Sequence, residues 1–260
     1  MKINIEHNNK LYQIDPKDGI SISIPMNFND SNNPKFYDES NPKKEFYTYN
    51  DIEYNMNRNA GCDVPLVKFN VHCSGTHTET AAHVFNDSHS IGDLIDLNFI
   101  PAILISVHPE SSTNDEYHSP INDDDKIISK RILEQSLDSE TEFIDCIIIR
   151  TLPNSEDKKN KNYNNFSYPF LSNDAVYFLK KKGVKHIIID TPSIDKSDDD
   201  GQLKNHKIFF LDNKSINKNT VTELAYIPDT CIDGRYFVCI GFPNFQLDAA
   251  PSNPVIYNIK

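Results

Sequence analysis

The sequence lacks the features of a membrane-spanning or secreted protein. No stretch of its 260 residues approaches the ~20 consecutive apolar residues that cross a bilayer. Residues 1–7 have no apolar core of the kind that signal peptides carry. The five cysteines are odd in number, scattered along the chain, and form no Cys-x-x-Cys pair, which is typical of a reducing compartment. We therefore expect a cytoplasmic protein with no membrane partner.

Positive charge is also scarce. The chain has 26 Lys and Arg residues against 38 Asp and Glu residues, which gives a net charge of −12. Non-specific binding to nucleic acid requires a positive surface, so we expect no nucleic-acid partner. The content of 38% hydrophobic and 25% charged residues suits a soluble globular protein with one substantial core.

Short apolar runs rich in Ile and Val outnumber the helical patterns. Because neither an internal repeat nor a linker between two cores is present, we expect a single domain over residues 1–260. Runs of this length and composition predict buried strands; they lie at residues 20–24, 64–71, 102–107, 143–149, 186–189, 208–211 and 236–241. Helices are predicted at residues 127–137 and 172–182, the second beginning at Ser172 and ending before Gly183. The fold class is therefore mixed α/β.

One segment of twelve residues concentrates the side chains that bind transition metals. It reads His72-Cys73-Ser74-Gly75-Thr76-His77-Thr78-Glu79-Thr80-Ala81-Ala82-His83. In an extended chain successive side chains point to opposite sides, so Cys73, His77 and Glu79 would share one face and His72 would face away. Three potential ligands on one face indicate a metal site.

The segment resembles the cyclase-like family of metal-dependent hydrolases, which includes bacterial kynurenine formamidase and isatin hydrolase. The family motif is His-x-Gly-Thr-His-x-Asp-x-x-x-His, and here Cys73 and Glu79 replace its first His and its Asp. Further blocks also resemble the family, namely residues 19–26, the Arg150-Thr151 end of an apolar run, and residues 183–195 with their Asp-Thr-Pro-Ser-Ile-Asp sequence.

The resemblance implies a fold, a reaction and an assembly. The implied fold is a single domain of the swivelling β/β/α type, with a mixed sheet and a few flanking helices. The implied reaction is hydrolysis of an amide C–N bond in a small-molecule substrate, an aryl formamide such as N-formylkynurenine or a cyclic amide or lactam. The implied assembly is a homodimer. The two departures from the motif leave an alternative, a non-hydrolytic protein on the same fold that binds a metal or a small molecule.

The resemblance also implies roles for individual residues. The metal ligands would be Cys73, His77, Glu79, His206 and Glu223. They would hold one or two divalent ions, most simply Zn²⁺ because a thiolate favours zinc, with Mn²⁺ as the other option. His72 competes with Cys73 for the first ligand position. His83 would be the acid–base catalyst, since its ordinary pKa suits proton transfer near neutrality.

Residues around these positions carry weaker expectations. Asp195 is expected to shape the turn beside the site, and Phe36 or Tyr37 to contact the substrate. The chain has no Trp, so any tryptophan that relatives use at the entrance is absent. His89 and His118 lie in polar segments and are expected to be solvated.

Overall fold

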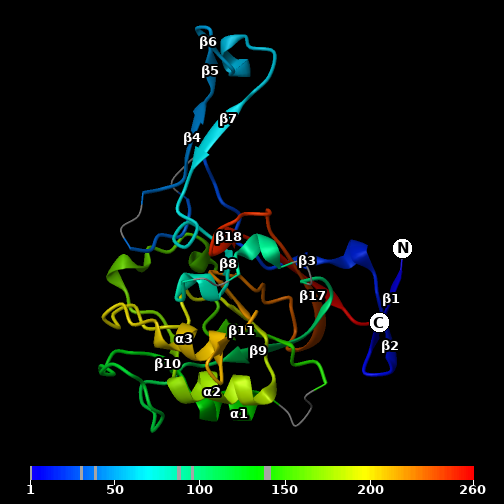
Figure 1. Cartoon of the computed structure of the whole chain (residues 1–260), viewed down its shortest axis with the longest axis vertical. Coiled ribbons are helices and arrows are strands. Elements are labelled where there is room, and N and C mark those ends of the chain that lie inside the picture. The colour runs from blue at the N-terminus through cyan, green and yellow to red at the C-terminus, as the bar shows by residue number, and fades with distance from the viewer. Residues whose placement is uncertain (1, 30–31, 38–39, 87–88, 95–96, 138–141) are drawn as a thin grey trace.

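A nine-stranded mixed sheet forms the centre of the computed structural model (Figure 1). The structure describes residues 2–29, 32–37, 40–86, 89–94, 97–137 and 142–260. From one edge to the other, the strands of the sheet are β18 (Ala249–Pro251), β8 (His77–Glu79), β16 (Thr220–Glu223), β13 (His186–Ile189), β11 (Cys146–Thr151), β9 (Ile100–Val107), β17 (Gly234–Gly241), β19 (Asn253–Asn258) and β3 (Ile20–Ser21).

The four middle strands β9, β11, β13 and β16 are parallel, and the remaining pairings in the sheet are antiparallel. Strands buried on both faces read as continuous apolar runs. In β11, Ile147 and Ile149 belong to one core cluster, whereas Ile148 belongs to the cluster on the opposite face. This arrangement confirms the mixed α/β class.

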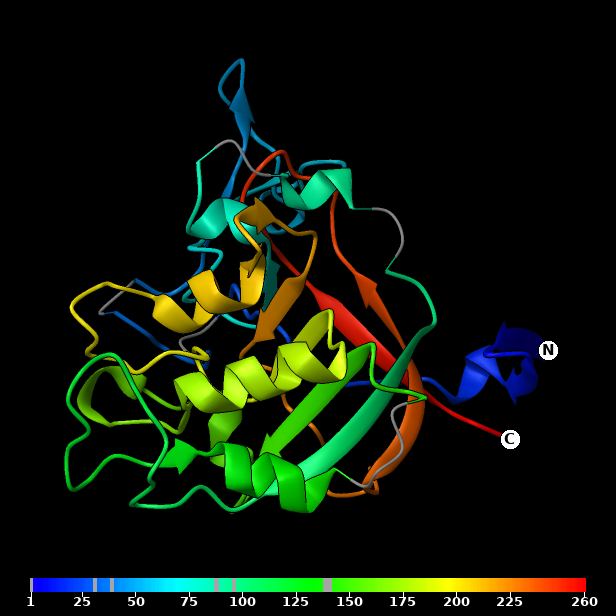
Figure 2. The same cartoon turned by 60° about the horizontal axis from the view of Figure 1, so that its bottom comes forward.

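Three α-helices cover one face of the sheet: α1 (Lys130–Ser136), α2 (Asn173–Lys182) and α3 (Lys204–Phe210). In Figure 2 they are the green, yellow-green and yellow coils in front of the strands. α2 confirms its predicted ends, because the Ser172 side chain accepts from the N–H of Ala175 and Gly183 takes the left-handed conformation at φ 90°. The predicted strand at residues 208–211 is wrong, since most of it lies in α3.

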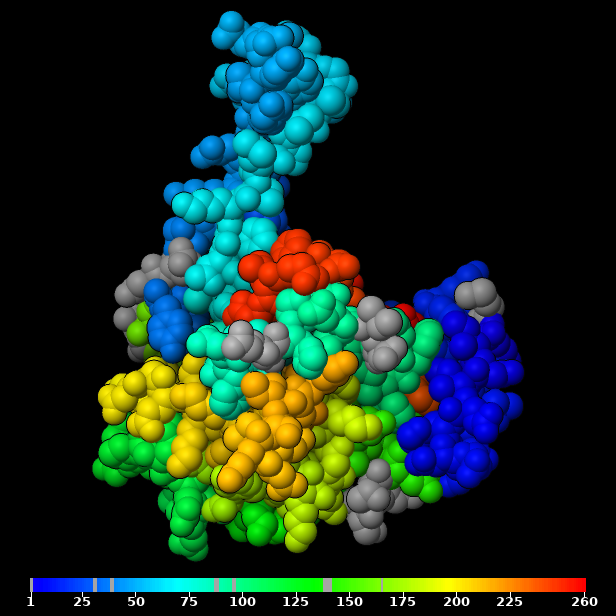
Figure 3. Space-filling model, in the orientation of Figure 1, coloured from blue at the N-terminus to red at the C-terminus, as the bar shows by residue number. Residues whose placement is uncertain are grey.

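The remaining strands form two-stranded pairs outside the main sheet. They are β1 (Ile3–His7) with β2 (Lys10–Ile14), β4 (Lys43–Phe46) with β7 (Pro65–Lys68), β5 (Thr48–Tyr49) with β6 (Ile52–Glu53), β10 (Ile127–Ile128) with β12 (Phe170–Leu171), and β14 (Leu211–Asp212) with β15 (Ser215–Ile216). β4 to β7 make an arm that stands away from the rest of the molecule (Figure 3). The expected buried strand at residues 64–71 is therefore wrong in its burial, because Leu66 and Val67 of β7 are 54% and 50% exposed.

Among the described residues, every helix is too short or too polar to cross a bilayer.

Candidate functional site

Two of the predicted ligands come from the short strand β8. This strand lies between β16 and β18, and its register places His77 opposite Glu223 of β16. His77 and Glu79 are two residues apart and point to the same side of the strand, and they are 0% and 1% exposed. His77 Nε2 lies 3.6 Å from Glu223 Oε2. The structure therefore brings His77, Glu79 and Glu223 together at one edge of the sheet.

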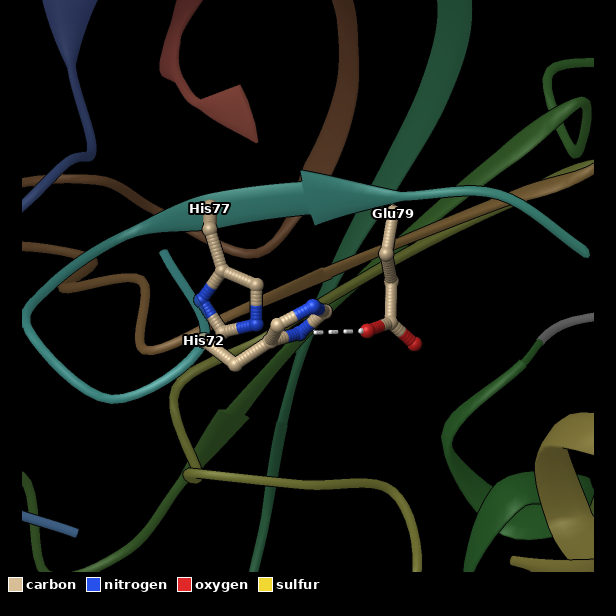
Figure 4. Close-up of side chains that lie close together, drawn as sticks. All are labelled: His72, His77 and Glu79. Carbon is tan, nitrogen blue, oxygen red and sulfur yellow. Dashed lines mark ion pairs between the residues drawn. The ribbon is translucent and has the colours of Figure 1, made fainter. Parts of the chain in front are cut away.

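The segment before β8 determines which residue joins them. Residues 71–75 form turns and bends, so the alternation of side chains along β8 does not extend back to residue 72. His72 Nδ1 lies 3.2 Å from Glu79 Oε2 (Figure 4), and the expectation that His72 faces away is wrong. Cys73 belongs to a buried cluster with Phe36, Tyr163, Tyr168 and Leu224.

His206 enters the site from the first turn of α3 and is oriented by a carboxylate. The N–H groups of Asn205 and His206 donate to Asp195, and the ring Nδ1 of His206 lies 2.7 Å from Asp195 Oδ2. On the other side of the ring, Nε2 lies 2.6 Å from Glu79 Oε1 and 3.3 Å from Glu223 Oε1. Asp195, expected only to shape a turn, thus also holds His206.

His83 follows β8 in the short 3-10 helix η3 (Ala81–His83), where the Thr80 side chain accepts from the N–H of Ala82. His83 Nε2 lies 3.9 Å from Glu79 Oε2, which is too long for a hydrogen bond. The His83 ring stacks on the ring of His72, with the centroids 4.3 Å apart. His83 is therefore beside the carboxylate cluster without being bonded to it.

Sequence reasoning missed Asp248, which lies just before β18. Its Oδ2 is 2.9 Å from His72 Nε2 and 3.0 Å from His83 Nδ1. β18 pairs with β8, so residues 165 or more positions apart meet at this edge. The only signal in the sequence was an isolated acid directly before Ala249-Ala250-Pro251.

The expectation that His118 is solvated is wrong. Its side chain is buried and bonded to Asp199.

The hydrogen bonds fix the proton positions on two of the imidazoles. His77 Nδ1 lies 3.0 Å from the carbonyl oxygen of Gly75, and His206 Nδ1 bonds Asp195. A carbonyl oxygen and a carboxylate only accept, so both Nδ1 atoms donate. In the neutral rings each Nε2 then carries a lone pair directed at the two glutamates. Neither Nε2 has a hydrogen-bond partner among the described residues.

Two buried carboxylates face one another across this cluster. Glu79 and Glu223 are 1% and 4% exposed, and their ion-pair partners in the described part of the chain are all histidines. Burial favours the neutral acid, yet His206 and His83 hold the pKa of Glu79 well below its usual value. The pKa of Glu223 is lowered by its ion pairs with His206 and His77, despite burial and the nearby Glu79. The site is therefore built to keep two carboxylates ionised.

His72 and His206 respond to these carboxylates in the opposite sense. Burial opposes protonation of His72, but Asp248 and Glu79 raise its pKa to about 10. Burial likewise opposes protonation of His206, and Glu79 and Asp195 hold its pKa well above the ordinary value. Both shifts come from neighbouring carboxylates, which are the partly exposed Asp248 and the buried Glu79 for His72, and the buried Glu79 and Asp195 for His206.

Four groups of described side chains could hold a divalent ion, among them His72, His83 and Asp248, and two of the four overlap at Glu79. One of these two is His72, His77 and Glu79, and the other is Glu79, His206 and Glu223; in each, one ligand atom per residue lies within 4.8 Å of the others. In the described part of the chain, both oxygens of Glu79 and the Nε2 atoms of His77 and His206 are buried and make only ion pairs, without a hydrogen bond of good geometry. Buried polar atoms in this state are costly unless a cation takes their lone pairs. The nitrogen and carboxylate donors suit Zn²⁺ and Mn²⁺.

An aromatic cleft of about 450 Å³ lies on the Cys73 side of the cluster. Its lining includes Phe36, Tyr37, Tyr163 and Phe166, and Phe36 and Tyr163 also pack around Cys73. Burial raises the pKa of Tyr37, with smaller contributions from Asp199, Cys73 and Glu223.

The chain matches known sequences and structures. The sequence model of the Cyclase family, described as "Putative cyclase", matches residues 20–196. Kynurenine formamidase from Bacillus cytotoxicus is 27% identical over 160 residues, which cover 61% of this chain and 66% of that protein, just under two thirds of its length. Kynurenine formamidase from Bacillus mycoides is 26% identical over 208 residues, which cover 79% of this chain and 85% of that protein.

Among solved structures, isatin hydrolase A from Labrenzia aggregata shares the fold. Its TM-score is 0.64 at 11% sequence identity, over 92% of this chain and 93% of that one. At this identity the likeness concerns the fold, which agrees with the expected swivelling β/β/α type.

Proposed function

This chain belongs to the Cyclase family, and we propose that it is a metal-dependent hydrolase that cleaves the C–N bond of an amide. The observation that carries the proposal is the convergence of imidazoles on two buried carboxylates, with His83 beside them but not bonded to them. A site that only stored a metal would have no use for a half-buried histidine whose Nε2 lies 3.9 Å from Glu79 Oε2.

The ligands we propose differ at one position from those that the family motif implies. His72, His77 and Glu79 would hold one ion, and Glu79, His206 and Glu223 a second. His72 replaces Cys73 in this set, because its Nδ1 is the atom that lies next to Glu79. Without the Cys73 thiolate, the ligand atoms of the proposed site are nitrogen and oxygen, so Zn²⁺ is the first ion to test and Mn²⁺ the second. When bound, such an ion polarises a carbonyl oxygen and activates water.

The chain's own residues then handle the proton and the substrate. His83 Nε2 accepts a proton from the attacking water as its oxygen bonds to the carbonyl carbon. The same imidazolium returns the proton to the nitrogen as the C–N bond breaks, which yields an amine and a carboxylic acid that then loses its proton to solvent. His77 and His206 keep their orientation through Gly75 and Asp195 during this exchange.

The aromatic cleft supports an aryl substrate. Phe36, Tyr37 and Phe166 line it, and their rings can stack on a planar ring at offset or edge-on geometry. We therefore propose an aryl formamide such as N-formylkynurenine or a cyclic amide of the lactam type as the substrate. A cytoplasmic location and a homodimer complete the proposal; the first is supported by five cysteines that form no disulfide.

A turnover panel tests the hydrolase against the non-hydrolytic alternative. The protein is loaded with zinc or manganese and offered N-formylkynurenine, isatin, a simple lactam and an aryl ester, with His83→Ala as the matched control. We expect hydrolysis of at least one amide by the parent protein and a loss of about 10²–10⁴-fold in the variant. Metal binding without hydrolysis of any amide would favour a binding protein on the same fold.

A further inference from the structure

Four histidines lie at the site: His72, His77, His83 and His206. Each has one ring nitrogen bonded to an oxygen that belongs to neither Glu79 nor Glu223. For His77 this oxygen is the Gly75 carbonyl, and for His206 it is the Asp195 carboxylate. His72 and His83 have neither partner, and a single atom, Asp248 Oδ2, takes that place for both. One carboxylate oxygen therefore determines the state of two imidazoles.

The position of Asp248 is set by the backbone. β18 pairs with β8 so that Ala249 lies opposite Glu79. The N–H of Thr80 donates to the Asp248 carbonyl at 2.9 Å, and the Thr80 hydroxyl is 3.2 Å from the same oxygen. Thr80 also caps the turn that carries His83. Thr80 thus holds both the backbone of Asp248 and the turn that carries His83, which fixes the distance between these two residues.

A carboxylate only accepts, so His72 Nε2 and His83 Nδ1 must both donate to it. In the neutral rings the lone pairs then lie on His72 Nδ1, which is 3.2 Å from Glu79 Oε2, and on His83 Nε2, which is 3.9 Å from the same oxygen. The first atom is the one that binds a metal in the proposed site, and the second is the one that accepts a proton.

We infer that Asp248 is a positioning residue that fixes the tautomers of His72 and His83 together, so that one presents a ligand atom and the other a proton acceptor. This inference rests on the proposed function for its catalytic consequence, but the tautomers themselves do not depend on it. Supporting residues of this kind usually contribute 10–100-fold in metal affinity or activity, and Asp248 is only partly exposed, at 35% of its side chain.

The test combines a tautomer measurement with a double-mutant cycle. Long-range ¹H–¹⁵N correlation spectra of zinc-loaded protein labelled in histidine should show His83 with its proton on Nδ1. In Asp248→Ala that proton should move to Nε2 or exchange between the two nitrogens. Asp124→Ala, which removes an exposed aspartate from a loop remote in sequence, is the charge-matched control and should leave the spectrum unchanged.

Zinc affinity, measured by competition with a chelator, gives the second readout. Asp248→Ala should weaken zinc binding about 10–100-fold, but in the background of His72→Ala it should weaken it by less than about threefold, because the two residues act as one unit. Asp248→Glu should restore part of the affinity. Equal weakening in both backgrounds, unchanged tautomers, or the loss of one equivalent of zinc, which would make Asp248 a ligand, would each overturn the inference.

These outcomes are separate from the fate of the proposed function. No substrate enters the measurements, so a protein that hydrolyses no amide can still confirm the role of Asp248. If the protein binds neither zinc nor manganese, the proposed function fails, and the His83 tautomer in the metal-free protein still decides whether Asp248 fixes it.

Discussion

Replacing His72 and Cys73 one at a time separates the metal site from the packing around it. The family motif assigns the first ligand to Cys73, whereas the structure places His72 Nδ1 3.2 Å from Glu79 Oε2 and packs Cys73, which is 6% exposed, against aromatic side chains. We therefore expect His72→Ala to weaken zinc binding by more than about 100-fold, since even supporting residues contribute 10–100-fold.

Cys73→Ser should affect stability instead. The substitution places a hydroxyl among Phe36, Tyr163, Tyr168 and Leu224, and burying a hydroxyl in place of the less polar thiol costs about 1–3 kcal/mol. We expect the free energy of unfolding to fall by that amount in urea, measured with chelator present so that metal makes no contribution. Zinc affinity of the folded variant should stay within about threefold of the parent.

The assay is zinc competition on both variants, with His89→Ala as the control for the loss of an exposed histidine outside the cluster. The reasoning is refuted if Cys73→Ser loses zinc more than 100-fold while His72→Ala retains it. That ranking would mean that the turn at residues 71–75 rearranges when metal binds and that the thiolate is the ligand.

Three further predictions follow from the same geometry. His77→Ala should lower the bound metal content sharply, as measured by elemental analysis, because His77 Nε2 belongs to the first group of ligand atoms. His83→Ala should keep the metal content near that of the parent and lower turnover by about 10²–10⁴-fold; an emptied site would show that His83 is a ligand. Burial lowers the pKa of His186 from 6.5 to about 4, so its neutral form stabilises the fold above pH 6.5 and this stability is lost as the pH falls to about 4. Within that window the free energy of unfolding falls by about 1.4 kcal/mol per pH unit. Urea unfolding at two pH values in the window should show a smaller change in the free energy of unfolding with pH for His186→Asn than for the parent.

The parts of the fold that the sequence predicted are those with local causes. Ser172 and Gly183 act on the helix next to them through single hydrogen bonds and a single backbone conformation, and α2 has the expected ends. The apolar runs at residues 102–107 and 143–149 lie in or overlap β9 and β11, because strands buried on both faces need apolar side chains throughout.

Where the local signal was ambiguous, the prediction was wrong. The run Ile208-Phe209-Phe210-Leu211 is too short to show a period, and short apolar runs of this kind fit a buried helix as well as a strand. The run at residues 64–71 has the composition of a buried strand, but its β7 part belongs to the arm and is exposed. The helical state of residues 208–210 and the exposure of β7 do not depend on residues near each run, so neither could be predicted from the run alone.

The candidate site shows the same division. Period-two alternation correctly placed His77 and Glu79 on one side of β8, and it gave the wrong direction for His72 because the chain turns before the strand begins. His206 and Glu223, which the resemblance implied, do meet Glu79. Whether these residues bind metal stays a prediction.

Asp248 could not be found by any local pattern, because its role arises from strand pairing. The chain leaves β8 at Glu79, and β18 returns beside it with Ala249 opposite that residue. Only this register brings the Asp248 carboxylate within 3.0 Å of both His72 and His83. The ligand question at residues 72 and 73 has the same origin. A ligating histidine almost always donates its other ring N–H to an acceptor, and Asp248 supplies one for His72. The departure at Cys73 is therefore compatible with an intact site, since the turn before β8 and the pairing of β18 together present His72 where the motif would place its first histidine.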